Sequence, residues 1–524
     1  MSVTGKIVAR KGRLHMVAAM AALSAMPSVG QIVPFKDAAK IKSWDAWNDH
    51  KGKQAWKEKR CVTWEKLNAM SPGLKEAGRL AVRDAKDIKS SKWSIGCETM
   101  DRDYADWNAY KFFLGPLGAK HGRLFSGWAK TEQEKGKYDF TWLDPQVREM
   151  AAMGIKPWIC LSYGNPVWGS DFRLGMRVKQ VTGNAEAFAA WIRYCTACVE
   201  RYKDVVDEWE IWNEPFRQGE EYAEMFYRTA KAIRAVQPSA KIYCTAITFP
   251  ADHRAVLEKL KKENALDLAS YFIYHPYDRN PDESYSKNAD PLRRLVKSYS
   301  GAFDIMQGEV GCPAQLEFAH ALNDTEWTEY SQAKWNLRRT IGDAVRAIPC
   351  SVFTMIDLQY TFMLQSFGML RSNALKEVVY RRPSYFAMQN VFSYLDDEAV
   401  PYGVCTDAAF VLTRRADPRD TAEHRLTCAR FTRFGRATRF YWFSNAIPSN
   451  RLEFDRVTLQ VPDRLERPVW VEMITGRIFE FDPANVRHED GKTVLDDVPM
   501  WDSPVMIADY VCVPRRCEKA KEVK

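Results

Sequence analysis

Residues 206–215 read VDEWEIWNEP, an apolar, strand-like run that leads directly into Asn213 and Glu214. A second string of the same kind, FDIMQGEVG at 303–311, places Glu309 immediately after another strand-like run. Aromatic and β-branched residues are enriched in strands. Both glutamates are therefore predicted to stand where a strand ends.

Short β-rich runs alternate with longer amphipathic segments from about residue 93 to residue 356. Segments between the runs, such as 186–202 and 223–237, carry apolar residues at helical spacing. The candidate strands start 29 to 50 residues apart, which fits a repeated strand–helix unit. Eight such units predict an α/β fold of the (β/α)8 TIM-barrel class. The eight candidate strands are KWSIGC (92–97), RLFSGW (123–128), KPWICLS (156–162), VDEWEIW (206–212), KIYCTAITF (241–249), SYFIYH (270–275), FDIMQGE (303–309) and SVFTMIDL (351–358).

The two glutamates end the fourth and seventh of these strands, 95 residues apart. Active sites of TIM barrels lie at the C-terminal ends of the strands, so Glu214 and Glu309 are predicted to share one site. Hydrolysis of a glycosidic bond requires two carboxyl groups, one to protonate the leaving oxygen and one to attack the sugar or activate water. The pair therefore predicts a sugar-cleaving enzyme. The alternative for Glu214 is a helix-capping loop acid, and for Glu309 a surface loop acid.

The chain divides into segments that differ in composition and in hydrophobic pattern. Residues 91–395 hold the predicted barrel. From about residue 396 to 514, alternating strands separated by Asp, Pro, Gly and Asn turns predict a C-terminal all-β sandwich. Residues 31–90, rich in Lys, Trp and helix formers, are expected to form a helical cap segment without chemistry. Residues 515–524 are expected to be a disordered tail.

The first 30 residues combine a basic start with an apolar stretch, 16–26, that is followed by small residues. This pattern is typical of a secretory signal peptide, so we expect an exported protein, periplasmic or secreted. The alternative is a frayed basic N-terminal helix on a cytoplasmic protein.

Charge and composition narrow the classes of partner. The formal charge is +9, and residues 1–60 hold twelve Lys or Arg against four Asp or Glu, so the rest of the chain is close to neutral. This distribution argues against a nucleic-acid-binding face on the folded body. No apolar run of 18 residues follows the N-terminus, so no membrane span is predicted. Cys195 and Cys198 form a CxxC inside a helical stretch, which favours packing over metal binding.

WNEP after a strand, with Gly308-Glu309 at the seventh strand, resembles clan A of the glycoside hydrolases, which are retaining enzymes on a TIM barrel. The resemblance implies that Glu214 is the acid/base and Glu309 the nucleophile. It also implies that Asn213 hydrogen-bonds the substrate 2-hydroxyl.

The resemblance extends over residues 93–510 in outline. Residues 127–158 are similar to the β-xylosidase and α-iduronidase group, 381–395 to the helix that closes these barrels, and 472–481 to their β-sandwich. Many members have a tryptophan at the end of strand eight, where this chain has IDLQ (356–359). This departure leaves the identity of the sugar open.

Other side chains near the predicted strand ends are candidate substrate contacts. His275 or Tyr277 is predicted to hydrogen-bond Glu309 and fix its orientation, with a structural histidine as the alternative. Glu98, after the first strand, is predicted to bind hydroxyls or to support the site. Arg123 is expected to support the lower face of the barrel. Further candidate sugar contacts are Trp128, Tyr163, Asn165, Trp168 and Asp357, with buried core as the alternative for the aromatic ones.

The expected partner is a carbohydrate, and neither a metal ion nor an organic cofactor is expected. A catalytically inactive carbohydrate-binding protein on the same barrel is the second hypothesis. Metal-dependent hydrolysis is a third, without an HExxH motif or clustered histidines in the sequence to support it. The sugar, the linkage and exo or endo action stay open, because loop geometry determines them. The oligomeric state also stays open.

Overall fold

The computed structural model describes residues 62–98, 100–170, 177–215, 217–245 and 250–516 of the 524-residue chain. These residues belong to one compact unit, Arg60–Lys524. The predicted signal peptide, residues 31–61 of the predicted cap segment and residues 517–524 of the predicted tail lie outside the described residues. Those expectations stay predictions.

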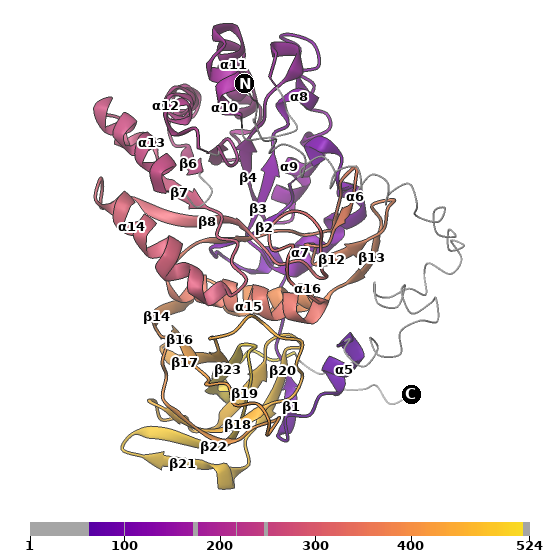
Figure 1. Ribbon diagram of the computed structural model, residues 1–524, viewed down its shortest axis with the longest axis vertical. Helices are drawn as coiled ribbons and strands as arrows, with labels where there is room; N and C mark the ends of the chain where they lie inside the picture. Colours follow the sequence, from indigo (N-terminus) through magenta and orange to yellow (C-terminus); the bar gives the residue numbers. More distant parts are fainter. Residues whose placement is uncertain (1–61, 99, 171–176, 216, 246–249, 517–524) are drawn as a thin grey trace, which may run out of the picture. The chain divides into compact units, whose positions relative to one another are not determined.

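A closed barrel of parallel strands forms the larger part of the fold (Figure 1). Each strand pairs with the next in sequence, and the last returns to the first, with Ser94 opposite Ser351. All the predicted strands overlap barrel strands, so the predicted fold class is confirmed. The strands are β2 (Trp93–Gly96), β3 (His121–Phe125), β4 (Lys156–Leu161), β5 (Glu208–Ile211), β6 (Lys241–Thr245), β7 (Tyr271–Tyr274), β8 (Asp304–Val310) and β9 (Cys350–Val352).

The barrel strands are buried on both faces, because helices cover the outside and side chains fill the inside. In β4, four successive residues from Trp158 to Leu161 have no exposed surface. Charged residues interrupt this apolar pattern at Arg123 of β3 and Glu210 of β5, which are also fully buried. Buried charges must be paired, and these two belong to the candidate site described below.

Helices lie around the outside of the barrel (Figure 1). Asn184 begins α11 by accepting hydrogen bonds from the backbone N–H groups of Glu186 and Ala187, and Cys195 and Cys198 lie on its buried face. The helices are α5 (Trp64–Ala69), α6 (Trp107–Tyr110), α7 (Leu114–Leu117), α8 (Trp128–Thr131), α9 (Asp144–Ala152), α10 (Val178–Thr182), α11 (Ala185–Tyr202), α12 (Gly219–Val236), α13 (Pro250–Lys262), α14 (Asp290–Lys297), α15 (Glu329–Val345) and α16 (Pro383–Tyr394). Of the helices in the described ranges, none has the length and apolar character that a bilayer crossing demands.

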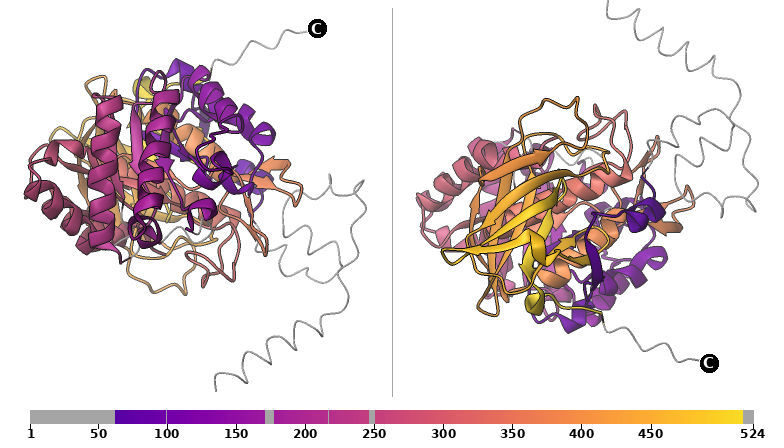
Figure 2. Two further views of the ribbon diagram at one scale, coloured as in Figure 1. Left: turned by 90° about the horizontal axis from the view of Figure 1, so that it is seen from above. Right: turned by 90° about the horizontal axis from the view of Figure 1, so that it is seen from below.

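The C-terminal region is a β-sandwich, as predicted (Figure 2). A seven-stranded antiparallel sheet has the order β1-β20-β19-β23-β17-β16-β14, and a four-stranded sheet has the order β15-β18-β22-β21. The strands are β1 (Lys75–Arg79), β14 (Ala399–Cys405), β15 (Phe410–Arg414), β16 (Leu426–Arg433), β17 (Arg436–Phe443), β18 (Asp455–Val461), β19 (Pro468–Glu472), β20 (Arg477–Glu480), β21 (Val486–Glu489), β22 (Lys492–Met500) and β23 (Val505–Asp509). Two small hairpins, β10 (Leu358–Gln359) with β11 (Leu364–Gln365) and β12 (Leu370–Ser372) with β13 (Val378–Arg381), lie between β9 and α16 in the sequence.

Within residues 62–90, the described part of the predicted helical cap segment, the structure has the short helix α5 and also a strand, β1. Residues 75–79 pair antiparallel with β20, with Lys75 opposite Glu480. Arg477 of β20 fastens this segment by donating to the carboxylate of Glu76 at 2.7 Å and to the backbone oxygen of Met70 at 2.5 Å. A free sheet edge here overrides the local helix propensity of a charged segment.

Helix α15 joins the barrel to the sandwich. It is buried from Tyr330 to Val345, because it lies between the two (Figure 1). Lys334 donates to Asp502 at 2.5 Å, and Arg338 donates to the backbone oxygen of Ser444 at 2.9 Å. A helix buried all round belongs to the interior of a protein. The sandwich is therefore part of the same packed body as the barrel.

Candidate active site

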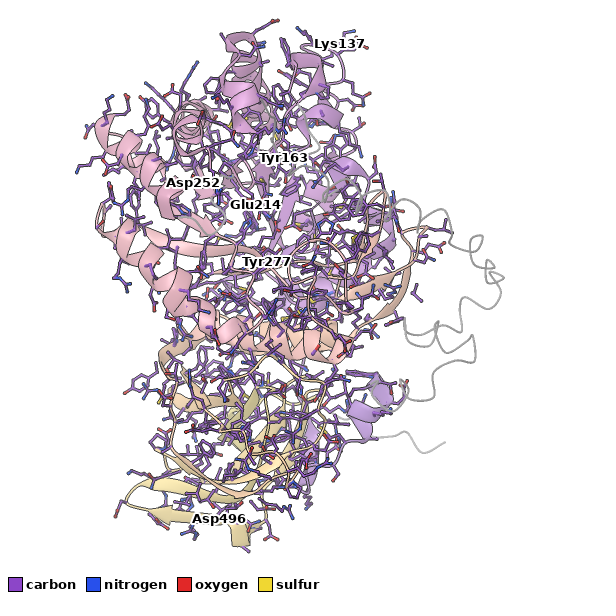
Figure 3. All side chains as sticks on the ribbon, in the orientation of Figure 1. Lys137, Tyr163, Glu214, Asp252, Tyr277 and Asp496 are labelled. Atoms are coloured by element: carbon purple, nitrogen blue, oxygen red, sulfur yellow. The ribbon has the colours of Figure 1, made fainter. Side chains whose placement is uncertain are left out.

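The two glutamates singled out in the sequence come together at the C-terminal end of the barrel. Glu214 follows β5 and Glu309 lies near the end of β8. One carboxylate oxygen of each, together with a ring nitrogen of His275, lie within 4.8 Å of one another. Tyr163, Glu214 and Tyr277, labelled in Figure 3, lie close together in the barrel region. The predicted meeting of the two carboxyl groups is thus present in the structure.

The backbone before Glu214 is strained. Trp212 has φ of 65° and Glu214 has φ of 52°, and neither residue is a glycine. Residues other than glycine, asparagine and aspartate rarely adopt this left-handed backbone conformation. Such strain persists where surrounding contacts enforce it, and it concentrates at functional sites. The turn after β5 is therefore built to aim one carboxyl group.

Both oxygens of the Glu309 carboxylate accept hydrogen bonds. Arg123 donates to Oε2 at 2.5 Å, and the Tyr277 hydroxyl donates to Oε1 at 2.9 Å. Burial would raise the pKa of Glu309, but the charges of His275 and Arg123 and these two hydrogen bonds outweigh it and hold the pKa below its usual value. Glu309 is therefore ionised at neutral pH, as a nucleophile must be.

Arg123 is the functional residue that sequence reasoning placed wrongly. We expected it to support the lower face of the barrel. Instead its fully buried guanidinium donates to Glu309, to both oxygens of Glu210 at 2.8 and 2.9 Å, and to Asn213 Oδ1 at 2.7 Å. A charged residue in the strand of a packed barrel needs a buried partner, and this was the available signal. The sequence did not show along which direction the long side chain extends.

Glu98 lies against the same guanidinium. Its Oε1 is 3.3 Å from Arg123 Nη1, and the residue is 2% exposed. Burial raises the pKa of Glu98 to about 8, the charge of Glu309 adds to the rise, and Arg123 opposes it. Glu98 is therefore largely neutral at pH 7, so the charge of Arg123 is left for Glu309 and Glu210. Of its two predicted roles, support of the site fits this burial better than contact with a sugar hydroxyl.

Glu214 has a different partner. His275 Nδ1 lies 2.8 Å from Glu214 Oε1, and the imidazole is fully buried. Burial would lower the pKa of His275, but the negative charge of Glu309 and the hydrogen bond and charge of Glu214 outweigh it, so the pKa is raised. The predicted partner of Glu309 is thus Tyr277, whereas His275 orients Glu214 and can exchange a proton with it.

Asn213 is held at both ends of its amide. Its Oδ1 accepts from Arg123, and its Nδ2 donates to the Tyr163 hydroxyl at 2.8 Å. Asn213 is 7% exposed and Tyr163 is 5% exposed. The amide therefore has one fixed orientation beside both carboxyl groups.

Three predicted sugar contacts are structural instead. Trp128 is fully buried, stacks on Tyr194 and donates its indole N–H to Glu132 at 2.5 Å. Asn165 is buried and donates to the backbone oxygen of Glu132 at 2.7 Å. Asp357 is 1% exposed and is ion-paired with two arginines. Residue type and strand-end position were right in each case, but the side chains point into packed interior.

Trp168 differs from the other candidates in what covers its ring. It lies in the short turn Pro166–Trp168 and is 8% exposed. Lys135 Nζ lies 4.2 Å from the ring centroid and the Arg193 guanidinium lies 5.7 Å from it. Cations over an aromatic face are favourable contacts in themselves, so the ring is already engaged.

The same three groups deserve comparison with a metal site, because Glu214, His275 and Glu309 offer ligand-type atoms. Both oxygens of Glu309 already accept hydrogen bonds, and His275 Nδ1 is directed at Glu214. The Arg123 guanidinium at 2.5 Å would also repel a cation placed there. The arrangement fits an ion-pair and hydrogen-bond network better than a metal centre.

Comparison with known proteins identifies solved structures with a similar fold. No protein-family model matches the sequence, and none of the curated proteins matches it. Solved structures do. The chain is similar to a family 39 glycoside hydrolase from Bacteroides cellulosilyticus WH2, with 16% identity, a TM-score of 0.57 and coverage of 82% of this chain and 81% of that one. The two chains therefore share their fold.

Two further structures agree. A monomeric beta-xylosidase from Caulobacter crescentus CB15 is 16% identical with a TM-score of 0.52, and the catalytic domain of the family 30 xylanase C from Talaromyces cellulolyticus is 9% identical with a TM-score of 0.50. Each match covers 83% of this chain and 98% of the other. The predicted fold, a TIM barrel with a C-terminal β-sandwich, is thereby confirmed.

Proposed function

We propose that this protein is a retaining glycoside hydrolase that cleaves β-glycosidic bonds of an oligo- or polysaccharide. The observation that carries the proposal is the approach of carboxylate oxygens of Glu214 and Glu309 to within 4.8 Å. In retaining enzymes the two carboxyl groups lie about 5 Å apart, whereas inverting enzymes leave several ångströms more for a water molecule.

In the first step Glu309 attacks the anomeric carbon while Glu214 protonates the leaving oxygen, so one C–O bond forms and one breaks. Arg123 and Tyr277 keep Glu309 ionised before the attack. The same two donors hydrogen-bond the Glu309 carboxylate again when the sugar is released from it in the second step. The negative charge lost from Glu309 moves to the leaving oxygen, where the proton of Glu214 neutralises it.

In the second step Glu214, now ionised, takes a proton from water, and the water oxygen displaces Glu309 from the sugar. The His275 imidazole at 2.8 Å stabilises the ionised form of Glu214 between the steps. Two displacements at one carbon retain its configuration. No step requires a group beyond the side chains and water.

Chemical rescue tests the proposal. Glu309→Ala should lose most turnover of an aryl β-glycoside and regain it with azide, which enters from the vacated face and gives a glycosyl azide of inverted configuration. Glu214→Ala with azide should give the azide of retained configuration. Glu489→Ala, an exposed acid of the sandwich, is the control and should match the wild type.

Other outcomes point to other functions. Full activity of Glu309→Ala would refute the assignment. A wild-type protein that binds oligosaccharides but turns over no member of a broad glycoside panel would favour the inactive carbohydrate-binding alternative. Activity lost to a chelator would favour metal-dependent hydrolysis.

A further inference from the structure

Five aromatic rings lie in contact at the C-terminal end of the barrel, and we call them the ring platform: Tyr104, Tyr360, His320, Phe362 and Phe318. Ring centroids are 4.4 Å apart for Tyr104 and Tyr360, and 4.6 Å apart for Tyr360 and His320. His320 stacks on Phe362 at 5.8 Å with 19° between the planes, and Phe362 lies 6.1 Å from Phe318. Phe362 also lies 5.8 Å from Tyr360, so the rings form one connected cluster.

The ring platform extends from half-buried rings to exposed ones. Tyr104 and Tyr360 are half-buried, whereas Phe362 is 58% exposed and Phe318 is 70% exposed. Isolated exposed apolar side chains need no explanation, but connected ones mark binding surfaces. The outer rings are therefore not explained by packing of this chain.

Three separate barrel connections supply the rings. Tyr104 follows β2, Phe318 and His320 follow β8, and Tyr360 and Phe362 lie in the β10–β11 hairpin after β9. All three connections leave the end of the barrel that holds Glu214 and Glu309. The backbone N–H of Gln359 donates to the backbone oxygen of Tyr104 at 2.8 Å. This hydrogen bond joins the connection after β2 to the connection after β9.

The inner end of the ring platform is linked to the candidate active site through Arg102. The Arg102 guanidinium lies 5.2 Å from the ring of Tyr104 and 5.1 Å from that of Tyr163, whose hydroxyl accepts from Asn213. Burial raises the pKa of Tyr360, and the charge of Glu309 adds to the rise. Tyr104 and Tyr163 thus share one cation, Arg102, which places the inner ring of the platform beside a residue that contacts Asn213.

The segment after β8 that carries Phe318 and His320 is held in a costly conformation. His320 has φ of 72° and Leu322 has φ of 60°, both in the left-handed region. Trp327 holds the segment by donating to the backbone oxygen of Leu322 at 2.9 Å. Strain kept at the expense of stability is a mark of a functional segment.

We propose that the ring platform binds further sugar units of an oligosaccharide whose reacting unit lies between Glu214 and Glu309. This rests on the proposed function, since the occupant is the continuation of that substrate. Flat aromatic faces suit the C–H faces of sugar rings, and the tyrosine hydroxyls and the imidazole suit sugar hydroxyls. Burial lowers the pKa of His320, so the exposed end of the platform presents a neutral imidazole at neutral pH.

The test compares short and long substrates of one sugar. A panel of aryl β-glycosides first identifies the sugar, and kcat/KM is then measured for that aryl glycoside and for oligosaccharides of two to five units. In the double variant Phe318→Ala/Phe362→Ala, the ratio of kcat/KM on the longest to the shortest substrate should fall about tenfold. Phe434→Ala, which removes a 70% exposed ring of the sandwich, is the matched control and should keep the wild-type ratio.

The outcomes separate this proposal from the proposed function. An unchanged ratio in the double variant overturns the ring platform as a sugar site while leaving hydrolysis intact. A changed oligomeric state with an unchanged ratio would overturn it in favour of a contact between copies.

If the wild type hydrolyses no glycoside, the proposed function fails, and affinity electrophoresis in xylan, glucan, mannan and galactan gels decides on the platform. Retardation of the wild type that the double variant loses would support it. Equal migration of the two proteins in every gel would overturn it.

Discussion

At the scale of single residues, the chemistry depends on how Arg123 distributes one positive charge. Its guanidinium contacts Glu98, Glu210 and Glu309, all buried or nearly so. One cation cannot balance three anions in a medium of low dielectric. Glu98 resolves the conflict by staying protonated. Glu309 thereby keeps the hydrogen bond and the charge of Arg123, which help to hold its pKa below the usual value.

The Tyr277 hydroxyl stabilises only the charged form of Glu309, so its removal should raise the pKa of that carboxyl. In Tyr277→Phe the acidic limb of the kcat/KM profile should move to higher pH by about one unit, the size expected for one hydrogen bond to a charged group. Tyr202→Phe is the matched control, because it removes a 2.9 Å hydrogen bond to Asp144 away from the site. An acidic limb that stays in place in Tyr277→Phe would contradict the assigned role.

Glu98 should make stability fall with rising pH. The unfolded chain releases this proton near 4.5 and the folded protein releases it near 8, so the unfolded state binds fewer protons between these values. The stability lost over this range is on the order of a few kcal/mol. Glu98→Gln removes the titration, so its Tm relative to the wild type should increase from pH 5 to pH 8.

Glu208 provides a control, because its contribution to stability should depend on pH with the opposite sign. His121 and Lys241 lower the pKa of this buried carboxyl to about 2 against the effect of burial. Its contribution to stability is present above the usual value and is lost as pH falls toward 2. Glu208→Gln should therefore cost most at neutral pH. Parallel Tm curves for Glu98→Gln and the wild type would refute the neutral form of Glu98.

At the scale of elements, the strands were predictable and their neighbours in space were less so. Apolar runs such as KPWICL are buried on both faces and carry a strong signal. Strand β1 has the sequence KEAGR, with no apolar face, and it exists because β20 offers an unpaired edge. Pairing across about 400 residues is not written in the local sequence.

The same limit applies to the site. The two glutamates could be found because a strand-end carboxyl has few structural uses and because their spacing matched three barrel units. Trp128 and Asp357 have equally suggestive positions, but their side chains face the interior. Sequence periodicity gives the strand and its end; the direction of a long side chain depends on tertiary packing.

Helix α15 gives a prediction at this scale. Lys334 is fully buried and pairs with Asp502 of the sandwich. Asp502→Asn leaves the lysine without its charge partner and should lower the free energy of unfolding by about 3 kcal/mol. Glu489→Gln, which breaks an exposed pair with Arg487, should cost less than about 1 kcal/mol. Equal Tm shifts for the two variants would show that the helix does not depend on this pair.

At the scale of the whole molecule, the barrel and the sandwich form one body. The seven-stranded sheet takes β1 from before the barrel in the sequence and its other strands from after it. Asn390 of α16 donates to the backbone oxygens of Met473 and Ile474, at 3.0 and 3.1 Å. The sandwich thus supports α16, one of the helices packed on the barrel.

In the proposed mechanism, Glu309 becomes covalently bonded to a sugar. Incubation with a 2-deoxy-2-fluoro aryl β-glycoside of the preferred sugar should slow the second step and leave the intermediate on the protein. Mass spectrometry should then find one fluoroglycosyl adduct, on the peptide that contains Glu309, and none in Glu309→Gln. An adduct on another carboxyl group, or turnover of the natural glycoside with inversion at the anomeric carbon, would contradict the account.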